Sequence, residues 1–336
     1  MQYPTISEYV KASQDVSDNL DMSTEATNAE LNEAITDEWG VKYSKDGRKL
    51  LKAPQKFYGT YSIRKGTKII CDYAFHDCYS LTDIVIPGGV TSIGDNAFYY
   101  CTSLTNIAIP SSVTSIGNSA FMCCKSLSSL VIPDSVTSIG KRAFVGCISL
   151  KSLVFPDGVT SIGDGAFRNC CSLGSLVIPN GVTSIGNWAF CDCSSLKSLV
   201  LPDSVVNLKG NPFCRWNGEL KCLSPYFIYD NKVLFDKDKS KIIAFRDKDT
   251  TSYIIPDSVT SIGDSAFRGC SSLTDIVIPD SVTSIGDYAF YGCKSLRILV
   301  LPDGVISIGY MALWGCYLPN TLRQKLSSRF GDKIFW

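Results

Sequence analysis

A fixed period of 23 residues constrains this chain more than any other feature of its sequence. Prolines recur at this interval from Pro87 to Pro225, and after one longer interval Pro256, Pro279 and Pro302 resume it. The stretch LTDIVIPGGVTSIGDNAFYYCTS, residues 81–103, is one complete copy. A short period over most of a chain indicates a repeat architecture, in which one unit is stable only when it is stacked on its neighbours.

The apolar pattern within one copy predicts the local structure. The segment LTDIVIP alternates as a short strand that Pro87 ends, because proline cannot donate to a strand ladder. Asp95 then has the place of an N-cap for a one-turn helix that holds Ala97 and Phe98. We expect these side chains to form the core of each unit: Leu81, Ile84, Ile86, Val90, Ile93, Ala97, Phe98 and Cys101. The expected fold is a right-handed β/α solenoid of about eleven units, with short parallel strands and one-turn helices.

The phase of the repeat divides the chain into five segments. We expect an acidic, partly helical leader at 1–56, repeats at 57–225, an inserted β-hairpin at 226–252, further repeats at 253–318 and a helical cap at 319–336. The leader contains two capping-box patterns, at Thr5–Glu8 and Thr27–Glu30. The turn of the hairpin is expected around residues 236–240, with the hairpin projecting from the solenoid or lying along its edge.

Charge and composition exclude several classes of function. Lys+Arg and Asp+Glu both total 32, so no overall field favours nucleic acid, and we expect no nucleic-acid partner. No apolar run has the roughly 20 residues of a membrane helix. The first residues lack a basic start and an apolar run, so the chain as given reads as cytoplasmic, with a cell-surface or secreted location if a leader was removed.

The cysteines and the single histidine indicate neither a metal site nor a catalytic one. One repeat position holds Cys78, Cys101, Cys124, Cys147, Cys170, Cys193, Cys270, Cys293 and Cys316. We interpret this ladder as buried free thiols, because cysteine packs as a small hydrophobe, although rungs about 5 Å apart also permit disulfides. His76 has no paired nucleophile or carboxylate constellation, so we expect no enzyme, metal or cofactor.

The copy LTDIVIPDSVTSIGDYAFYGCKS, residues 273–295, resembles the BspA-type leucine-rich repeat family, with Pro, Val, Ile, Gly, Ala-Phe and Cys in phase in copy after copy. The resemblance extends from about Tyr58 to Cys316 and implies a right-handed leucine-rich solenoid. It also implies a relation to bacterial and protist surface proteins, some of them adhesins. The chain departs from an adhesin in lacking a secretion leader and a surface-anchor signal in the sequence as given.

Two surfaces are candidates for partner binding. The first is the outward side of the predicted strands, where an aliphatic line runs beside polar residues. Its candidate contacts are Val85, Val131, Val154, Val177, Val200, Val277, Val300, Asp83 and Asp275. A contiguous exposed apolar patch usually marks a binding surface, but β-branched residues also suit strands without any partner.

The second candidate surface is the hairpin, where Tyr226, Tyr229 and Phe235 lie among lysines. Aromatic residues near basic ones suit a protein or glycan partner, and they also suit an aromatic minicore below a solvated turn. A third, variable position follows each Ala-Phe pair and is expected to face solvent. It is occupied by His76, Tyr99, Met122, Val145, Arg168, Cys191, Arg268, Tyr291 and Trp314.

Taken together, these patterns favour a non-enzymatic scaffold that binds a protein through its strand surface, with the hairpin tuning specificity. The alternative is a cell-surface adhesin for a host matrix protein or a glycan.

Overall fold

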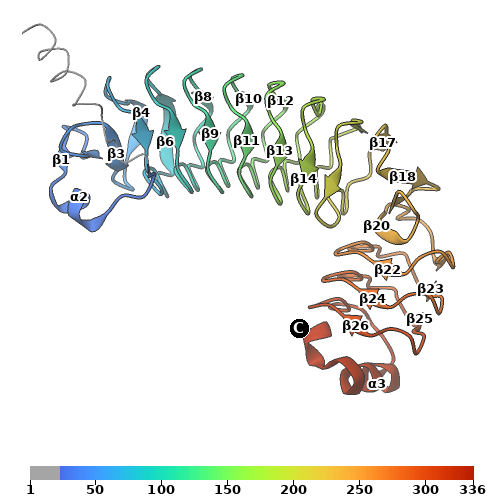
Figure 1. The fold of residues 1–336 in the computed structure, drawn as a ribbon. Coiled ribbons are helices and arrows are strands. Elements are labelled where there is room, and N and C mark those ends of the chain that lie inside the picture. The colour runs from blue at the N-terminus through green and yellow to red at the C-terminus, as the bar shows by residue number, and fades with distance from the viewer. Residues whose placement is uncertain (1–22) are drawn as a thin grey trace, which may run out of the picture.

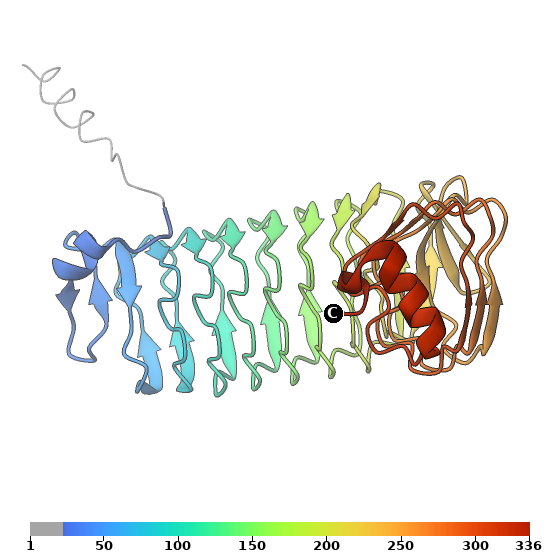
Figure 2. The same cartoon turned by 90° about the horizontal axis from the view of Figure 1, so that it is seen from below.

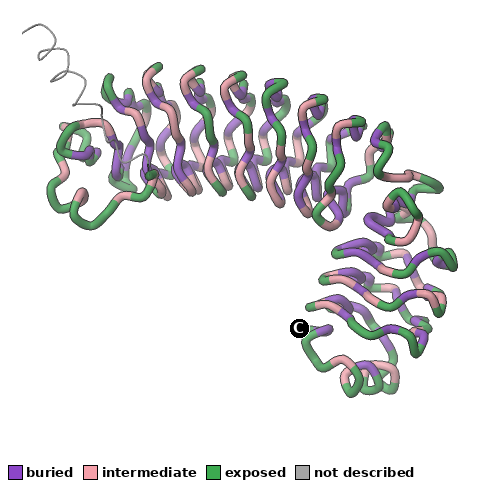
Figure 3. The backbone as a smooth tube through the Cα atoms, viewed as in Figure 1, coloured by how far each residue is buried: buried purple, intermediate pink, exposed green. Residues whose placement is uncertain are grey.

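The computed structural model describes residues 23–336, and the repeats form a parallel β-solenoid of about 11 turns (Figure 1). The predicted solenoid class is therefore confirmed. The eight core positions of the copy from Leu81 to Cys101 are each at most 7% exposed, and Figure 3 shows buried positions recurring from turn to turn. A single unit has nothing to bury these groups against, so the stacking itself stabilises every turn.

Each regular turn contributes two short strands. The first set aligns in parallel and carries Ser-Ile pairs in all of its first-arm strands except the first and the last, with Ser opposite Ser and Ile opposite Ile. In the first arm, residues 23–222, this set comprises β5 (Ile69–Ile70), β7 (Ser92–Ile93), β9 (Ser115–Ile116), β11 (Ser138–Ile139), β13 (Ser161–Ile162), β14 (Ser184–Ile185) and β16 (Asn207–Leu208).

The second set of strands has outward side chains whose surface we call the strand face. In the first arm it comprises β4 (Tyr58–Ser62), β6 (Ser80–Val85), β8 (Asn106–Ala108), β10 (Ser129–Val131), β12 (Ser152–Val154), β15 (Ser198–Leu201) and β17 (Glu219–Cys222). These strands pair in parallel within three short sheets, β4-β6-β8, β10-β12 and β15-β17. In the second of them β10 pairs with β12 through Leu130↔Leu153.

The segment that carries Ala-Phe is an irregular turn, and the one-turn helix expected there is wrong. Asn96 and Tyr100 have φ angles of 55° and 59°, and the positions equivalent to them are left-handed in most other turns. Two left-handed residues within five exclude a helix, which needs right-handed φ throughout. Asp95 is accordingly no helix cap: its Oδ1 accepts the backbone N–H of Asn118 in the next turn, at 2.6 Å.

Two ladders of side chains run along the core. The rings from Phe75 to Phe213 are stacked, with centroids 5.2–6.0 Å apart. Beside them seven of the nine ladder cysteines donate to a phenylalanine carbonyl of the previous turn, as Cys101 does to Phe75 at 3.1 Å. Cys78, at the start of the ladder, donates to the carbonyl of Pro54. The ladder cysteines are free buried thiols, as predicted, and burial raises the pKa of Cys193 to about 12.

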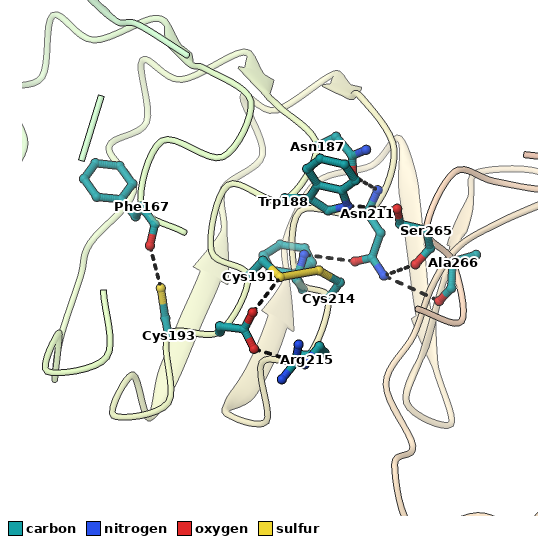
Figure 4. Close-up of a disulfide and its surroundings, with 12 residues drawn as sticks. Phe167, Asn187, Trp188, Cys191, Cys193, Asn211, Cys214, Arg215, Ser265 and Ala266 are labelled. Carbon is teal, nitrogen blue, oxygen red and sulfur yellow. Dashed lines mark hydrogen bonds and ion pairs between the residues drawn. A yellow bond between two sulfur atoms is a disulfide. The ribbon is translucent and has the colours of Figure 1, made fainter. Parts of the chain in front are cut away.

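One pair of cysteines forms a disulfide, whereas we expected free thiols. It joins Cys191 to Cys214, whose Cα atoms are 4.9 Å apart (Figure 4). Neither residue belongs to the ladder: Cys191 follows Ala189-Phe190, and Cys214 has the same place one turn later, after Phe213. Most of the ladder thiols donate to backbone carbonyls, whereas the sulfurs of Cys191 and Cys214 face each other between turns.

This disulfide predicts a redox-dependent stability. Its sequence separation is 23, and a crosslink that closes a loop of this size stabilises by about 3 kcal/mol. We expect a reductant to lower the melting temperature of the native chain in differential scanning calorimetry. The double variant Cys191→Ser/Cys214→Ser should melt at the reduced value with or without reductant. A reductant effect that persists in this variant would assign the stabilisation to another pair.

The acidic leader contributes a structured cap as far as it is described. Thr27 and Glu30 form the predicted capping box at the start of helix α2 (Asn28–Asn32). Strands β1 (Ile35–Thr36), β2 (Lys42–Tyr43) and β3 (Lys49–Lys52) then form an antiparallel extension, and β3 pairs in parallel with β5. This extension covers the edge that the first turn would otherwise leave open. The capping box predicted at Thr5–Glu8 lies outside the described residues.

The insert, residues 226–252, replaces a rung of the solenoid. It contains the antiparallel strands β18 (Phe227–Asp230), β19 (Val233–Asp236) and β20 (Lys241–Phe245), so the hairpin predicted around residues 236–240 is present. The expectation that it projects or lies along an edge is wrong. Strand β20 pairs in parallel with β22 (Ser261–Ile262) and so starts a second sheet.

The chain bends sharply at the insert, and the strands of the insert together with the turns after it form a second arm, residues 227–336 (Figures 1 and 2). In the described residues no strand pair joins the last Ser-Ile strand of the first arm, β16, to β20. The second arm contains β22, β24 (Ser284–Ile285) and β26 (Ser307–Ile308) in one sheet, and β21 (Ser252–Ile254), β23 (Asp275–Val277) and β25 (Ile298–Val300) on the strand face.

The C-terminal cap forms as predicted. Helix α3 (Asn320–Phe330) buries Leu326, and the short helix η1 (Asp332–Ile334) follows it. The backbone N–H of Leu313 donates to the carbonyl of Ile334 at 2.8 Å, so the tail completes the last turn.

Arg246 lies at the bend, where the phenylalanine ladder is interrupted between Phe213 and Phe245. Its guanidinium carbon lies 4.3 Å from the ring centre of Trp216 and 5.8 Å from that of Phe213. It donates to the carbonyl of Gly218 at 2.6 Å and to the hydroxyl of Tyr229 at 3.2 Å. One side chain thus joins the end of the first arm to the start of the second.

Candidate binding surfaces

The strand face of the first arm displays a row of valines. Within β10 and β12, Leu130 and Leu153 point into the core, so the alternating side chains point to solvent. Val131, Val154 and Val177 are 67%, 61% and 79% exposed. Val131 and Val154 are direct cross-strand partners, and the parallel bridge between Ser152 and Ser175 places Val177 beside Val154, so these three valines are contiguous.

The bend divides this row, which the sequence predicts as one line. In the first arm it contains Val85, Val131, Val154, Val177 and Val200, all exposed, and in the second arm it contains Val277 and Val300, also exposed, with Ile254. Val200 is paired with Lys221 in β17, where the aliphatic row ends. The physical reason is that the insert follows β17 and turns the second arm away.

The two predicted carboxylates of the strand face are half-buried beside the row. Asp83 accepts a hydrogen bond from the hydroxyl of Thr105 at 3.4 Å. Asp275 accepts one from Thr274 at 2.5 Å. Both carboxylates are therefore tied to neighbouring threonines on the same face.

The insert keeps fewer of its aromatic residues on the surface than the sequence predicts. Tyr226 is 46% exposed, whereas Phe235 is 3% exposed and packs in the core of the second arm. Tyr229 is half-buried and accepts a hydrogen bond from Arg246. The prediction of Phe235 as a contact residue is wrong, because its side chain projects from β19 into the core cluster that contains Phe245 and Ile262.

The position after Ala-Phe gathers polar and aromatic side chains along one side of the solenoid. His76 stacks on Tyr99 at 4.9 Å, and its Nδ1 lies 3.1 Å from the carboxylate of Asp77. Tyr291 stacks on Trp314 at 4.4 Å. Arg168 and Arg268 have the same position in the two arms.

The inside of the bend brings this side of the two arms together. Trp188 of the first arm donates its Nε1–H to Ser265 at 2.8 Å, and Asn211 donates to the carbonyl of Ser265 at 2.9 Å (Figure 4). Trp188 also packs edge-on against Tyr288 at 5.5 Å. We call this region the inner corner. Sequence reasoning missed it because Trp188 and Ser265 are 77 residues apart, and no period relates them.

Residues 23–336 contain neither a candidate metal site nor a candidate membrane-spanning helix. No group of three or more His, Cys, Asp and Glu side chains there is arranged to hold a metal ion. No helix in this part of the chain is long and apolar enough to cross a bilayer.

Solved structures with the same fold come from bacteria. A leucine rich cell surface protein from Faecalibacterium prausnitzii A2-165 is 30% identical, with a TM-score of 0.66, and the match covers 82% of this chain and 84% of that one. A leucine-rich repeat protein from Eubacterium ventriosum is 25% identical, with a TM-score of 0.55 over 85% of this chain and 72% of that one. The pneumococcal vaccine antigen PcpA, 20% identical with a TM-score of 0.54 over 83% and 72%, shares the fold alone.

No curated protein matches the sequence. The family model described as a BspA type leucine rich repeat region (6 copies) matches residues 68–173, 114–224 and 241–335, which together make up well over half of the chain. The resemblance read from the repeats is thereby confirmed. The chain belongs to the BspA-type leucine-rich repeat family.

Proposed function

We propose that the protein is a non-enzymatic scaffold that binds a protein partner through the valine row of the first arm. The observation that carries this proposal is the exposure of Val131, Val154 and Val177, at 67%, 61% and 79%, on three successive turns. Isolated exposed apolar side chains are normal on a soluble protein, whereas a contiguous row usually marks an interaction surface.

The scaffold beneath the row supports this role. The buried partners of the exposed valines, such as Leu130 and Leu153, fix the strands in register. A binding surface on rigid strands loses little conformational entropy when a partner docks. A protein partner also suits the length of the row better than a small ligand does, because the row is a surface and not a hollow.

Lysine substitutions in the row test the proposal. We expect Val131→Lys/Val177→Lys to weaken binding of the partner at least about tenfold, because each change places a charge in an apolar contact. The measurement is surface plasmon resonance against the partner identified by affinity capture with the native chain. The free energy of unfolding should change by less than about 0.5 kcal/mol, since both positions are exposed.

A matched control is Thr114→Lys/Thr160→Lys, which adds the same charge at exposed positions outside the strand face. Unchanged affinity in the valine variant would overturn the proposal. Equal weakening in both variants would assign the effect to net charge instead of to the row.

A cell-surface adhesin is the second candidate function, and the Cys191–Cys214 disulfide favours it. Disulfides persist in oxidising compartments and are rare in the cytosol. The relative from Faecalibacterium prausnitzii is described as a cell surface protein. Protease treatment of intact cells tests this location: loss of the protein supports display on the surface, and full protection argues against it. Host matrix protein or a glycan would then be the ligand.

The proposed scaffold role includes no catalytic step. His76, the one histidine, is engaged with Asp77 and Tyr99. Any turnover that His76→Ala abolished would contradict a purely binding role.

A further inference from the structure

The inner corner contains a hollow of about 530 Å³ that neither arm forms alone. Arg168 and Arg215 line it from the first arm, and Arg268, Tyr291, Lys294 and Trp314 line it from the second. The arms touch across it, because the stem of Arg215 lies against Gly269: a Cβ on this glycine would be 2.7 Å from Cγ of Arg215. The hollow exists only because the insert bends the solenoid.

The lining is strongly cationic in a chain whose formal net charge is zero. Four of its side chains are positive, and among the described residues that line it none is acidic. Asp192, which does not line the hollow, pairs with Arg215 at 3.1 Å. Burial lowers the pKa of Arg268, and the charges of Arg168 and Arg215 contribute in the same direction. Like charges held this close favour a bound anion.

Two of the arginines are held in place by aromatic rings, which leaves hydrogen-bond donors free. The guanidinium of Arg268 lies 4.0 Å from the ring centre of Tyr291, and Trp314 covers the other face of that ring at 4.4 Å. Arg168 lies 5.6 Å from the ring centre of Trp188, and its buried Nε–H has no hydrogen-bond acceptor within residues 23–336. A stacked guanidinium is planar and oriented, so its edge can bind a carboxylate in a bidentate manner.

We infer that the inner corner binds an acidic peptide segment of a protein partner, with Asp or Glu carboxylates on Arg168, Arg268 and Arg215. The volume lies in the range of ligand sites. The combination of Trp, Tyr and Arg is that of the residues that dominate protein–protein binding energy. This inference rests on the proposed function as a protein-binding scaffold but uses a different surface.

Fluorescence anisotropy with a labelled Glu-Gly repeat peptide tests the inference on the full chain. We expect the peptide to bind, and an otherwise identical Gln-Gly peptide to bind at least about tenfold more weakly, because carboxylates form charge-assisted hydrogen bonds. Arg215→Glu/Lys294→Glu should weaken binding of the Glu-Gly peptide at least about tenfold. Both side chains are exposed. Arg215 also contacts Gly269 and Asp192, so Lys294→Glu alone, which should weaken binding in the same direction, is measured beside the double variant, and circular dichroism checks the fold of both.

The control Lys151→Glu/Lys197→Glu makes the same change of net charge at exposed lysines away from the corner, and it should leave most of the affinity intact. Equal loss in this control, or no loss in the corner variant, would overturn the inference. Equal binding of the Gln-Gly peptide would do so too. Stronger binding of a sulfated oligosaccharide than of the Glu-Gly peptide would replace the acidic peptide by a glycan.

The same assay separates this inference from the proposed function. Val131→Lys/Val177→Lys should leave binding of the Glu-Gly peptide undiminished, because these residues are remote from the corner. A corner that fails while the valine row still binds its partner would refute only the acidic-peptide site.

Discussion

Replacing Phe144 by alanine is expected to lower the free energy of unfolding by about 3–5 kcal/mol, the range for a fully buried aromatic side chain. Phe144 is 0% exposed and stacks between Phe121 at 5.5 Å and Phe167 at 5.4 Å. The substitution leaves a cavity in the middle of the ladder and removes two ring contacts, each worth about 0.5–1.5 kcal/mol. Urea unfolding followed by circular dichroism measures the change.

The position of Phe144 makes this effect spread to adjacent turns. Each turn contacts only its neighbours, so a weakened rung also loosens the turns that carry Phe121 and Phe167. Hydrogen exchange should therefore accelerate in both of these turns. Ile306→Ala is the control, because Ile306 is 80% exposed and its truncation should cost less than about 0.5 kcal/mol. A loss below about 1 kcal/mol for Phe144→Ala would show that the stack does not determine stability.

The second large effect is expected at the bend. Arg246→Met should lower the free energy of unfolding by about 3 kcal/mol, because it removes charged hydrogen bonds and cation–π contacts together. The carbonyl of Gly218 loses its donor at 2.6 Å, and the ring of Trp216 loses a cation at 4.3 Å. Urea unfolding measures the loss, and small-angle X-ray scattering measures whether the arms open.

Two further variants separate the causes. Arg246→Lys keeps the charge but not the planar fork, so we expect it to recover only part of the stability. Lys232→Met breaks the exposed ion pair with Asp247 at 3.1 Å, which should cost less than about 1 kcal/mol. If Arg246→Met proved as mild as Lys232→Met, the bend would be held by the contacts of Trp188 and Asn211 instead.

The repeat predicted the core of this protein well, for a physical reason. Each turn places equivalent side chains at equivalent positions in the core. A residue such as Leu81, Ile84 or Phe98 is therefore surrounded by the same kinds of neighbours as its equivalents in the other turns. Burial read from one copy therefore holds for the others. The cysteine ladder followed from the same reasoning. The helical cap at Leu326 also followed, because a helical period after the last repeat has an open edge to cover.

The predictions were wrong for segments whose structure depends on the backbone conformation that stacking selects. The Asp-x-Ala-Phe segment has the composition of a capped helical turn, yet stacking selects left-handed φ at Asn96 and Tyr100. These angles let the backbone N–H of Asn96 and Tyr100 donate to the next turn, at 2.8 Å in both cases. Phe235 was placed on the surface because a hairpin alone would expose it, whereas its strand became a buried rung.

The sequence by itself determined the solenoid, its period and its buried ladders, because these depend only on neighbouring copies. The tertiary structure alone decided the bend, the division of the valine row, the Cys191–Cys214 disulfide and the inner corner. The disulfide depends on two thiols outside the cysteine ladder that face each other in adjacent turns of the first arm. The other three features depend on how a non-repeating insert redirects the second arm. That redirection brings Trp188 to Ser265 and Arg168 close to Arg268, contacts between distant turns that no periodic pattern encodes.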